Sequence, residues 1–120
     1  MRRAALFAIV VGVMMFAQWG VSLLAGNVPE LVTEPIRIAF HLAAEAATAV
    51  ALIVGGVGLL RRTKWARPVY ATATGMLLYT SLVSPGYFAQ QGVLAPVGLF
   101  ALIAVFALIN LRTVYGNGSR

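Results

Sequence analysis

Cysteine is absent from the 120-residue sequence, which also holds a single histidine. Without cysteine the chain has no disulfide, no thiolate metal site and no thiol nucleophile. His41 and Glu45 lie four residues apart and can reach one ion, but a third ligand would have to be Glu34 or come from another subunit. Haem with two histidine ligands would need a dimer. We therefore expect neither a metal nor a cofactor.

Charged residues are also scarce. They make up 10% of the chain, against about a quarter of a soluble domain. Hydrophobic residues make up 61%, and a water-soluble fold of this size cannot bury so much apolar surface. The net charge of +6 would suggest nucleic acid in a soluble chain, but the cations lie in short gaps between apolar runs. We therefore predict a protein partnered by the lipid bilayer, with no nucleic-acid partner.

Four apolar segments are long enough to cross a bilayer, which needs roughly 20 helical residues. They span about residues 4–25, 35–60, 66–83 and 93–111. Turn-forming residues separate them, among them Gly26 and Pro29 after the first segment and Ser84-Pro85-Gly86 after the third. The sequence thus predicts one all-α domain over residues 1–120. Its architecture is a polytopic transmembrane bundle of four helices, arranged as two helical hairpins.

The distribution of Lys and Arg predicts the orientation of these segments. With four spans, every cation but Arg37 falls on one side of the membrane, and cytoplasmic loops carry such an excess. We predict that both termini are cytoplasmic and that loops 26–34 and 84–92 lie outside. A cleaved signal peptide is an alternative for the first segment, although its apolar stretch is long and no A-x-A site follows. The cations on the predicted inner side are Arg2, Arg3, Arg61, Arg62, Lys64, Arg67, Arg112 and Arg120.

One face of the second segment carries most of the polar chemistry. Glu34, Arg37, His41, Glu45 and Thr48 are spaced 3, 4, 4 and 3 residues apart, which places them in one helical stripe. Glu45 lies about 15 Å into the segment, near the centre of the bilayer. A carboxylate at that depth must be protonated or paired, and His41 is one helical turn away.

Two interpretations of this stripe stay open. It is either a polar pocket or proton site, or a structural clasp in which Glu45 and His41 satisfy each other and bond to Gln18, Tyr79 or Thr80. Further inward the same face carries only leucines, at positions 52 and 59. We therefore expect a cavity that opens outward and is closed inward. Its predicted lining is Arg37, His41, Glu45, Thr48, Gln18 and Tyr79.

Small residues and aromatics complete the pattern. A second face of residues 35–60 is small and predicts close helix packing; its members are Ala44, Ala47, Ala51, Gly55 and Gly58. Aromatic residues are predicted to anchor the membrane surfaces, Trp65, Tyr70 and Tyr115 at the inner one and Tyr87 and Phe88 at the outer one. The outer loop of residues 84–91 is either a plain turn or a lid over the polar stripe.

The stretch HLAAEAATAVALIVGGVGLLRR, followed by WARPVYATATGMLLYTSLVSPGYFAQQG, resembles small uncharacterised four-helix membrane proteins of bacteria and archaea. It is also distantly similar to the DoxX-like group, through His41, Glu45, Gly55, Gly56 and Gly58. The resemblance implies the plasma membrane of a prokaryote and a quinone-linked redox role. Small multidrug-resistance transporters share the four helices and one membrane glutamate, but theirs lies in the first helix.

These features favour three classes of function, in descending order. The first is a membrane protein that binds a small polar or lipidic ligand, or a partner subunit, beside the stripe. The second is a proton-coupled small-molecule transporter that uses Glu45, and the third is a quinone-linked redox subunit. This order favours a role other than an enzyme and leaves the question open. Because four short helices bury little surface, we also expect a homodimer, a larger homo-oligomer or a partner membrane subunit.

Overall fold

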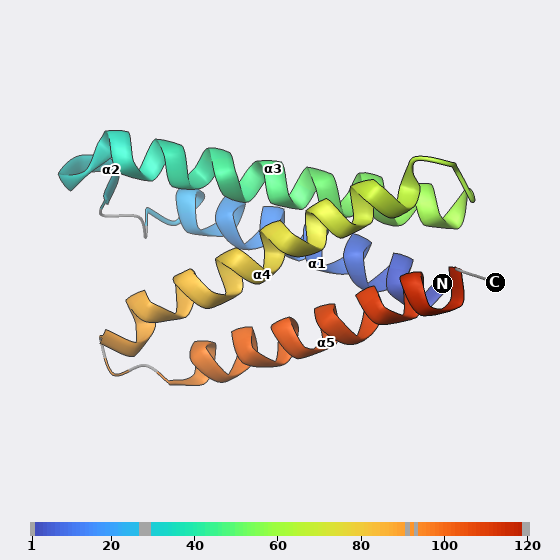
Figure 1. Ribbon diagram of the computed structural model, residues 1–120. Helices are drawn as coiled ribbons and strands as arrows, with labels where there is room; N and C mark the ends of the chain where they lie inside the picture. The colour runs from blue at the N-terminus through green and yellow to red at the C-terminus, as the bar shows by residue number, and fades with distance from the viewer. Residues whose placement is uncertain (1, 27–29, 91, 93, 119–120) are drawn as a thin grey trace.

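The computed structural model describes the backbone of residues 2–26, 30–90, 92 and 94–118, and the side chains of these residues except 30, 84–90, 117 and 118. Throughout this described part the regular structure is helical, which confirms the all-α class. Four long helices run side by side along a molecule of 51 × 24 × 20 Å (Figure 1). The helices are α1 (Arg2–Leu24), the short α2 (Glu30–Thr33), α3 (Pro35–Leu60), α4 (Ala66–Gln90) and α5 (Ala95–Gly118).

The C-terminal ends of α4 and α5 differ most from the sequence-based boundaries. We expected Ser84-Pro85-Gly86 to end the third helix, but α4 continues through it to Gln90. A proline inside a helix removes one backbone hydrogen bond, and long membrane helices tolerate this because neighbouring groups can satisfy the freed carbonyl. The predicted outer loop of residues 84–92 is therefore mostly helix. The predicted lid over the polar stripe depends on the side chains of residues 84–91, and these lie outside the part of the chain that the structure describes.

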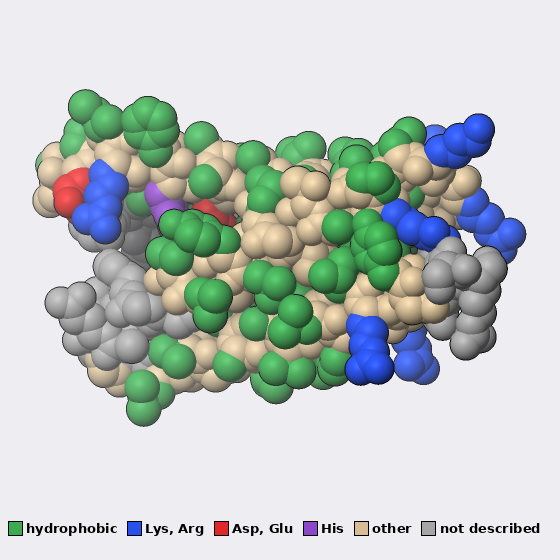
Figure 2. All heavy atoms as spheres, viewed as in Figure 1, with side chains coloured by type: hydrophobic (Ala, Val, Ile, Leu, Met, Phe, Trp, Pro, Cys, Tyr) green, Lys and Arg blue, Asp and Glu red, His purple; other side chains and the backbone are tan. Residues whose placement is uncertain are grey.

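Three of the long helices are long and apolar enough to cross a membrane, namely α1, α3 and α5. By that criterion α4 is not among them, because its threonines, tyrosines and Arg67 lower its hydropathy. Large apolar side chains cover the flanks of the bundle, while Lys and Arg gather toward one end (Figure 2). Such a surface is expected of a membrane protein. We call the cationic end the basic end, and its described cations are Arg2, Arg3, Arg61, Arg62, Lys64, Arg67 and Arg112.

The central helix of the bundle is α3, which packs closely on both α1 and α4. A Cβ atom added at Gly56 would lie 2.7 Å from the carbonyl oxygen of Ala5 on α1. A Cβ atom at Gly55, on the neighbouring face, would lie 3.1 Å from Cα of Tyr70 on α4. Backbones approach this closely in helical membrane proteins only where the residues between them are small. The small face of α3 therefore packs as predicted at its glycine end.

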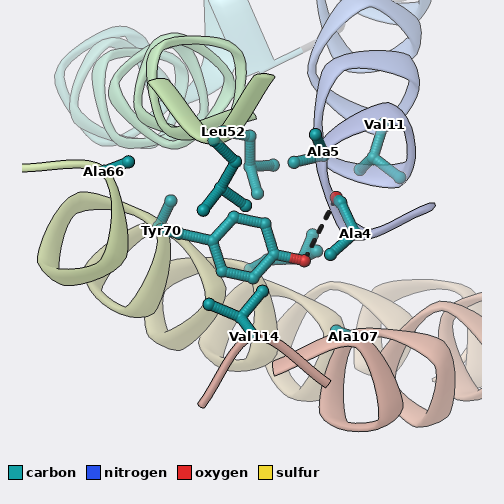
Figure 3. Packing of buried hydrophobic residues seen from close by; sticks show 12 residues of the cluster. Ala4, Ala5, Val11, Leu52, Ala66, Tyr70, Ala107 and Val114 are labelled. Carbon is teal, nitrogen blue, oxygen red and sulfur yellow. Dashed lines mark hydrogen bonds between the residues drawn. The ribbon is translucent and has the colours of Figure 1, made fainter. Parts of the chain in front are cut away.

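The buried core lies toward the basic end, where α5 also contacts α1 and α4. Its largest fully buried side chain is Tyr70, whose hydroxyl donates a hydrogen bond to the carbonyl oxygen of Ala4 at 3.3 Å (Figure 3). The prediction that Tyr70 anchors the membrane surface was therefore wrong. Tyr70 lies on the same face of α4 as Ala66, Ala73 and Leu77, which is the face that packs into the core.

Replacing Gly56 with alanine tests this packing. The added methyl group must push α1 away from α3, so we expect Gly56→Ala to lower the free energy of unfolding by about 1–3 kcal/mol, as overpacking does. The measurement is an unfolding titration with SDS in mixed micelles. Gly98→Ala on α5 is the matched control, because a Cβ atom there meets nothing within 4 Å. Equal stability of the two variants would contradict the close approach.

Candidate functional site

A groove of about 470 Å³ lies between α3 and α4, on the half of the bundle away from the buried core. The glycines that bring the two helices together are at the basic end of α3. Farther from that end the facing residues are larger and polar, and they leave a hollow between the helices. The groove is lined by His41, Ala44, Glu45 and Thr48 of α3, and by Thr72, Gly75, Met76, Tyr79, Thr80 and Val83 of α4.

Glu45 lies at the base of this groove with only 11% of its side chain exposed. The hydroxyl of Thr80 donates a hydrogen bond to Oε1 of Glu45, which links α4 to α3. The same oxygen lies 3.7 Å from Nε2 of His41, close enough for an ion pair when the imidazole is protonated but too far for a hydrogen bond. Glu45 is thus held across the helix pair by Thr80, while the imidazole of His41, 38% exposed, can still bond to a ligand.

Trp19 of α1 supports His41 from the other side. The two ring centroids are 5.5 Å apart and the ring planes meet at 69°, an edge-to-face contact. The spacing of polar residues does not indicate this contact, because the partner of His41 is an aromatic ring on another helix. A comparison of depths would have found it, since Trp19 is late in α1 and His41 is early in the antiparallel α3.

Two threonines of the groove wall already use their hydroxyl hydrogens in bonds within their own helices. Thr48 donates its hydroxyl hydrogen to the carbonyl oxygen of Ala44 at 2.9 Å, and Thr72 donates to that of Pro68 at 2.9 Å. Such bonds to the preceding helical turn leave only the oxygen lone pairs for a ligand. The described residues offer no group of three His, Cys, Asp or Glu that could hold a metal ion. His41 and Glu45 are therefore the main groups on α3 for bonding to a ligand.

Comparison with protein families covers almost the whole chain. A family profile described as "Domain of unknown function (DUF8058)" matches residues 1–118. The chain belongs to the DUF8058 family. Comparison with curated proteins and with solved structures finds no match. The resemblance to DoxX-like proteins stays a prediction.

Four of the seven predicted site residues line the groove of this DUF8058 protein, namely His41, Glu45, Thr48 and Tyr79. Arg37 and Glu34 do not, because they pair with each other at 3.2 Å and are exposed near the N-terminal end of α3. Gln18 is exposed on α1 and is not among the lining residues. The continuous stripe predicted from the helical spacing is thus divided into an exposed ion pair and a separate polar groove.

The groove opens on the flank of the DUF8058 bundle, between α3 and α4. In Figure 2, a His side chain and an acidic side chain are visible on the long side of the molecule, nearer the end opposite most of the Lys and Arg side chains. Tyr79, 70% exposed, and Gly75 line the opening. On α3, the face that continues toward the basic end is closed by the buried Leu52 and Leu59. We predicted a cavity entered from the outer water phase, and this direction stays a prediction; the described lining residues lie on the seam between α3 and α4.

Proposed function

We propose that the DUF8058 protein spans the membrane four times, and that α4 crosses it together with α1, α3 and α5. The 25 residues of α4 extend for about 38 Å, which is enough to cross the hydrocarbon core. Several of its described polar residues are buried in the bundle or bonded. Thr74 and Ser81 are buried in the bundle, and Thr72 bonds to its own helix. These contacts allow a helix of lower hydropathy to lie in lipid beside α3 and α5.

We propose that the basic end lies in the cytoplasm and that the membrane is the plasma membrane of a prokaryote, and the charge distribution supports the first of these. The start of α1, the end of α5 and the turn between α3 and α4 lie at this end (Figure 1). Among the described residues, Arg37 is the one cation at the opposite end, where Glu34 neutralises it. Cations are retained on the cytoplasmic side during insertion, so this end is the inner one.

A reporter that is active only outside the cytoplasm, fused after residue 120, tests this orientation. We expect no activity there and clear activity when the same reporter follows residue 26. The fusions are compared at equal expression, measured with an epitope tag. Activity at residue 120 would contradict the four-span arrangement.

We propose that the protein binds an amphipathic, lipidic ligand in the groove between α3 and α4. The observation that carries this proposal is the place of Glu45 and His41, which lie at the base of a groove that opens on an apolar flank. A volume of about 470 Å³ lies within the range of ligand pockets, about 300–1,000 Å³. The exposed Val83 and the partly buried Met76 line the groove and would contact the apolar part of the ligand.

Energetics favour a ligand with hydrogen-bonding groups. A charged carboxylate near the centre of the bilayer costs about 3 kcal/mol or more, so Glu45 gains from every donor that reaches it. Thr80 supplies one donor, and His41 lies beyond hydrogen-bonding distance. A ligand hydroxyl or amine that lies between His41 and Glu45 would add a second donor in a medium of low dielectric constant. The exposed hydroxyl of Tyr79 can bond to the same polar group.

The alternatives differ in what they require of the groove. A transporter needs a second opening toward the basic end, where Leu52 and Leu59 are buried, so the closed end favours binding over transport. A purely structural clasp explains the bond from Thr80 to Glu45 but not the exposed His41 beside it. A quinone is one lipidic ligand of the proposed class, so the quinone-linked role is a special case. A homodimer or partner subunit stays a prediction, and the lightly buried α5 is the surface most open to it.

Filling the groove with a large side chain tests the proposal. A Cβ atom at Gly75 meets nothing within 4 Å, so Gly75→Phe should fold normally and occupy the ligand space. The protein is purified in polymer-bounded discs of native membrane, and the bound molecules are quantified by mass spectrometry against bulk lipid. We expect one amphipathic molecule to be enriched with the wild type. Its enrichment should fall about tenfold or more in Gly75→Phe, which corresponds to a loss of about 1.4 kcal/mol of binding free energy.

Gly98→Phe is the matched control, because Gly98 also has open space but lies on α5, outside the groove. It should retain the enriched molecule. Glu45→Gln keeps an oxygen that can accept from Thr80 and should still weaken binding, which a clasp alone does not predict. The proposal is wrong if no molecule is enriched, or if Gly75→Phe retains it as Gly98→Phe does.

A further inference from the structure

The basic end carries cations without any acidic residue to neutralise them. Seven described Lys and Arg side chains lie there, all of them exposed except the partly buried Arg67. The three acidic residues of the chain are at positions 30, 34 and 45, beyond the other end of α3 or within it. The field at this surface is therefore strongly positive, and an anion is the complementary partner.

Two tyrosine hydrogen bonds fix the arginines of three helices relative to one another. The hydroxyl of Tyr70 donates to the carbonyl oxygen of Ala4 at 3.3 Å, which holds the start of α1 and its two arginines against α4. The hydroxyl of Tyr115 on α5 donates to the carbonyl oxygen of Arg67 at 3.2 Å. Arg112 lies one turn before Tyr115 on the same helix. Cations from separate parts of the chain thus share one preformed surface.

Arg62 has a backbone conformation that favours glycine. Its φ is +56°, in the left-handed region. The amide of Thr63 bonds to the carbonyl oxygen of Gly58 at 3.0 Å, and the amide of Arg62 bonds to that of Leu59 at 3.2 Å. This pair of bonds is the Schellman motif that ends many helices, and glycine is the usual residue at the position of Arg62. A strained residue that the surroundings hold in place is often kept for a contact that its side chain makes.

We propose that the basic end binds the headgroup phosphates of anionic phospholipids, and that Arg62 is held in its strained conformation to contact them. The guanidinium group forms paired hydrogen bonds with phosphate oxygens, which a lysine cannot reproduce. Retention of cations in the cytoplasm explains why Lys and Arg are numerous at this end. It does not explain why arginine stands at position 62, whose backbone conformation favours glycine, since Arg61 and Lys64 already supply positive charge beside it. The inference requires that the basic end lies at a bilayer surface. It does not require that the groove holds a ligand.

Trp65 provides a local reporter for this surface. It lies between Lys64 and Ala66 at the basic end and is 48% exposed. The only other tryptophan is Trp19, beside His41 of the groove, so Trp19→Phe leaves a single fluorophore at the basic end. The full chain is placed in bilayers of phosphatidylcholine with brominated phosphatidylglycerol or brominated phosphatidylcholine. The quenching of Trp65 then gives the relative affinity for the anionic lipid.

We expect quenching to show at least about a fivefold preference for phosphatidylglycerol, since each nearby arginine contributes about a fivefold factor. The preference should approach one in 1 M salt, because the charges are then screened. Arg62→Gly and Arg62→Asn should each reduce it about fivefold, while the melting temperature stays the same or rises, because both residues accept a positive φ. Arg37→Gln removes one charge at the opposite end and should leave the preference unchanged.

Equal quenching by the two lipids in the Trp19→Phe protein at low salt would overturn the proposal. So would an unchanged preference in both Arg62 variants, or a loss in Arg37→Gln equal to theirs. Inorganic phosphate, added at constant ionic strength, should not displace phosphatidylglycerol. Displacement by phosphate would show that the surface takes a soluble anion in place of a lipid. The enriched molecule of the groove should persist in both Arg62 variants, so the two proposals fail independently.

Discussion

The close approach of α3 to its two neighbours determines the rest of the structure. Gly56 allows α1 to contact one face of α3, and Gly55 and Gly58 allow α4 and the Trp65 ring to contact another. In lipid, apolar side chains gain little from leaving the solvent, so van der Waals contact between small residues is a principal force between helices. The glycines lie in the half of α3 nearest the basic end, and helix packing is therefore tightest there.

The groove follows from where this packing stops. Beyond Leu52 the residues of α3 that face α4 are no longer glycines, and the seam contains Thr48, Glu45 and His41. The bond from Thr80 to Glu45 keeps the helices linked, but it does not fill the space between them. One helix pair thus combines a rigid packed half, which holds the cationic surface, with a half that has room for a ligand. The two proposed sites are at different depths and use different chemistry.

Much of the helix pattern could be predicted from the sequence, because apolar runs, prolines and glycines mark it directly. The predicted boundaries of the second segment, 35–60, coincide with α3, and its polar and small faces follow from the helical period. The end of α4 could not be predicted from local turn chemistry, since Ser84-Pro85-Gly86 is typical of a turn but the backbone of α4 stays helical to Gln90.

Most of the predicted site lies on one helix, and Tyr79 and Thr80 of α4 were the correct predictions from a second helix. His41, Glu45 and Thr48 follow from the spacing along α3, but the contact of Trp19 and the exclusion of Gln18 depend on how α1 is rotated. The direction of the opening also depends on rotation, because α4 turns Tyr79 and Gly75 outward and Tyr70 inward. Sequence spacing describes the faces of a single helix, and only packing shows which neighbour each face meets.

Collision measurements on a nitroxide label test most directly that the groove opens to lipid. The chain has no native cysteine, so a single cysteine replacing Tyr79 can be labelled at the rim of the groove. In bilayers, dissolved oxygen should relax this label as strongly as one replacing Leu102 on the exposed face of α5, and a water-soluble nickel chelate should reach neither. A label replacing Lys64 at the basic end should show the opposite pattern. Strong relaxation of the label at position 79 by the nickel chelate would contradict a groove that opens to lipid.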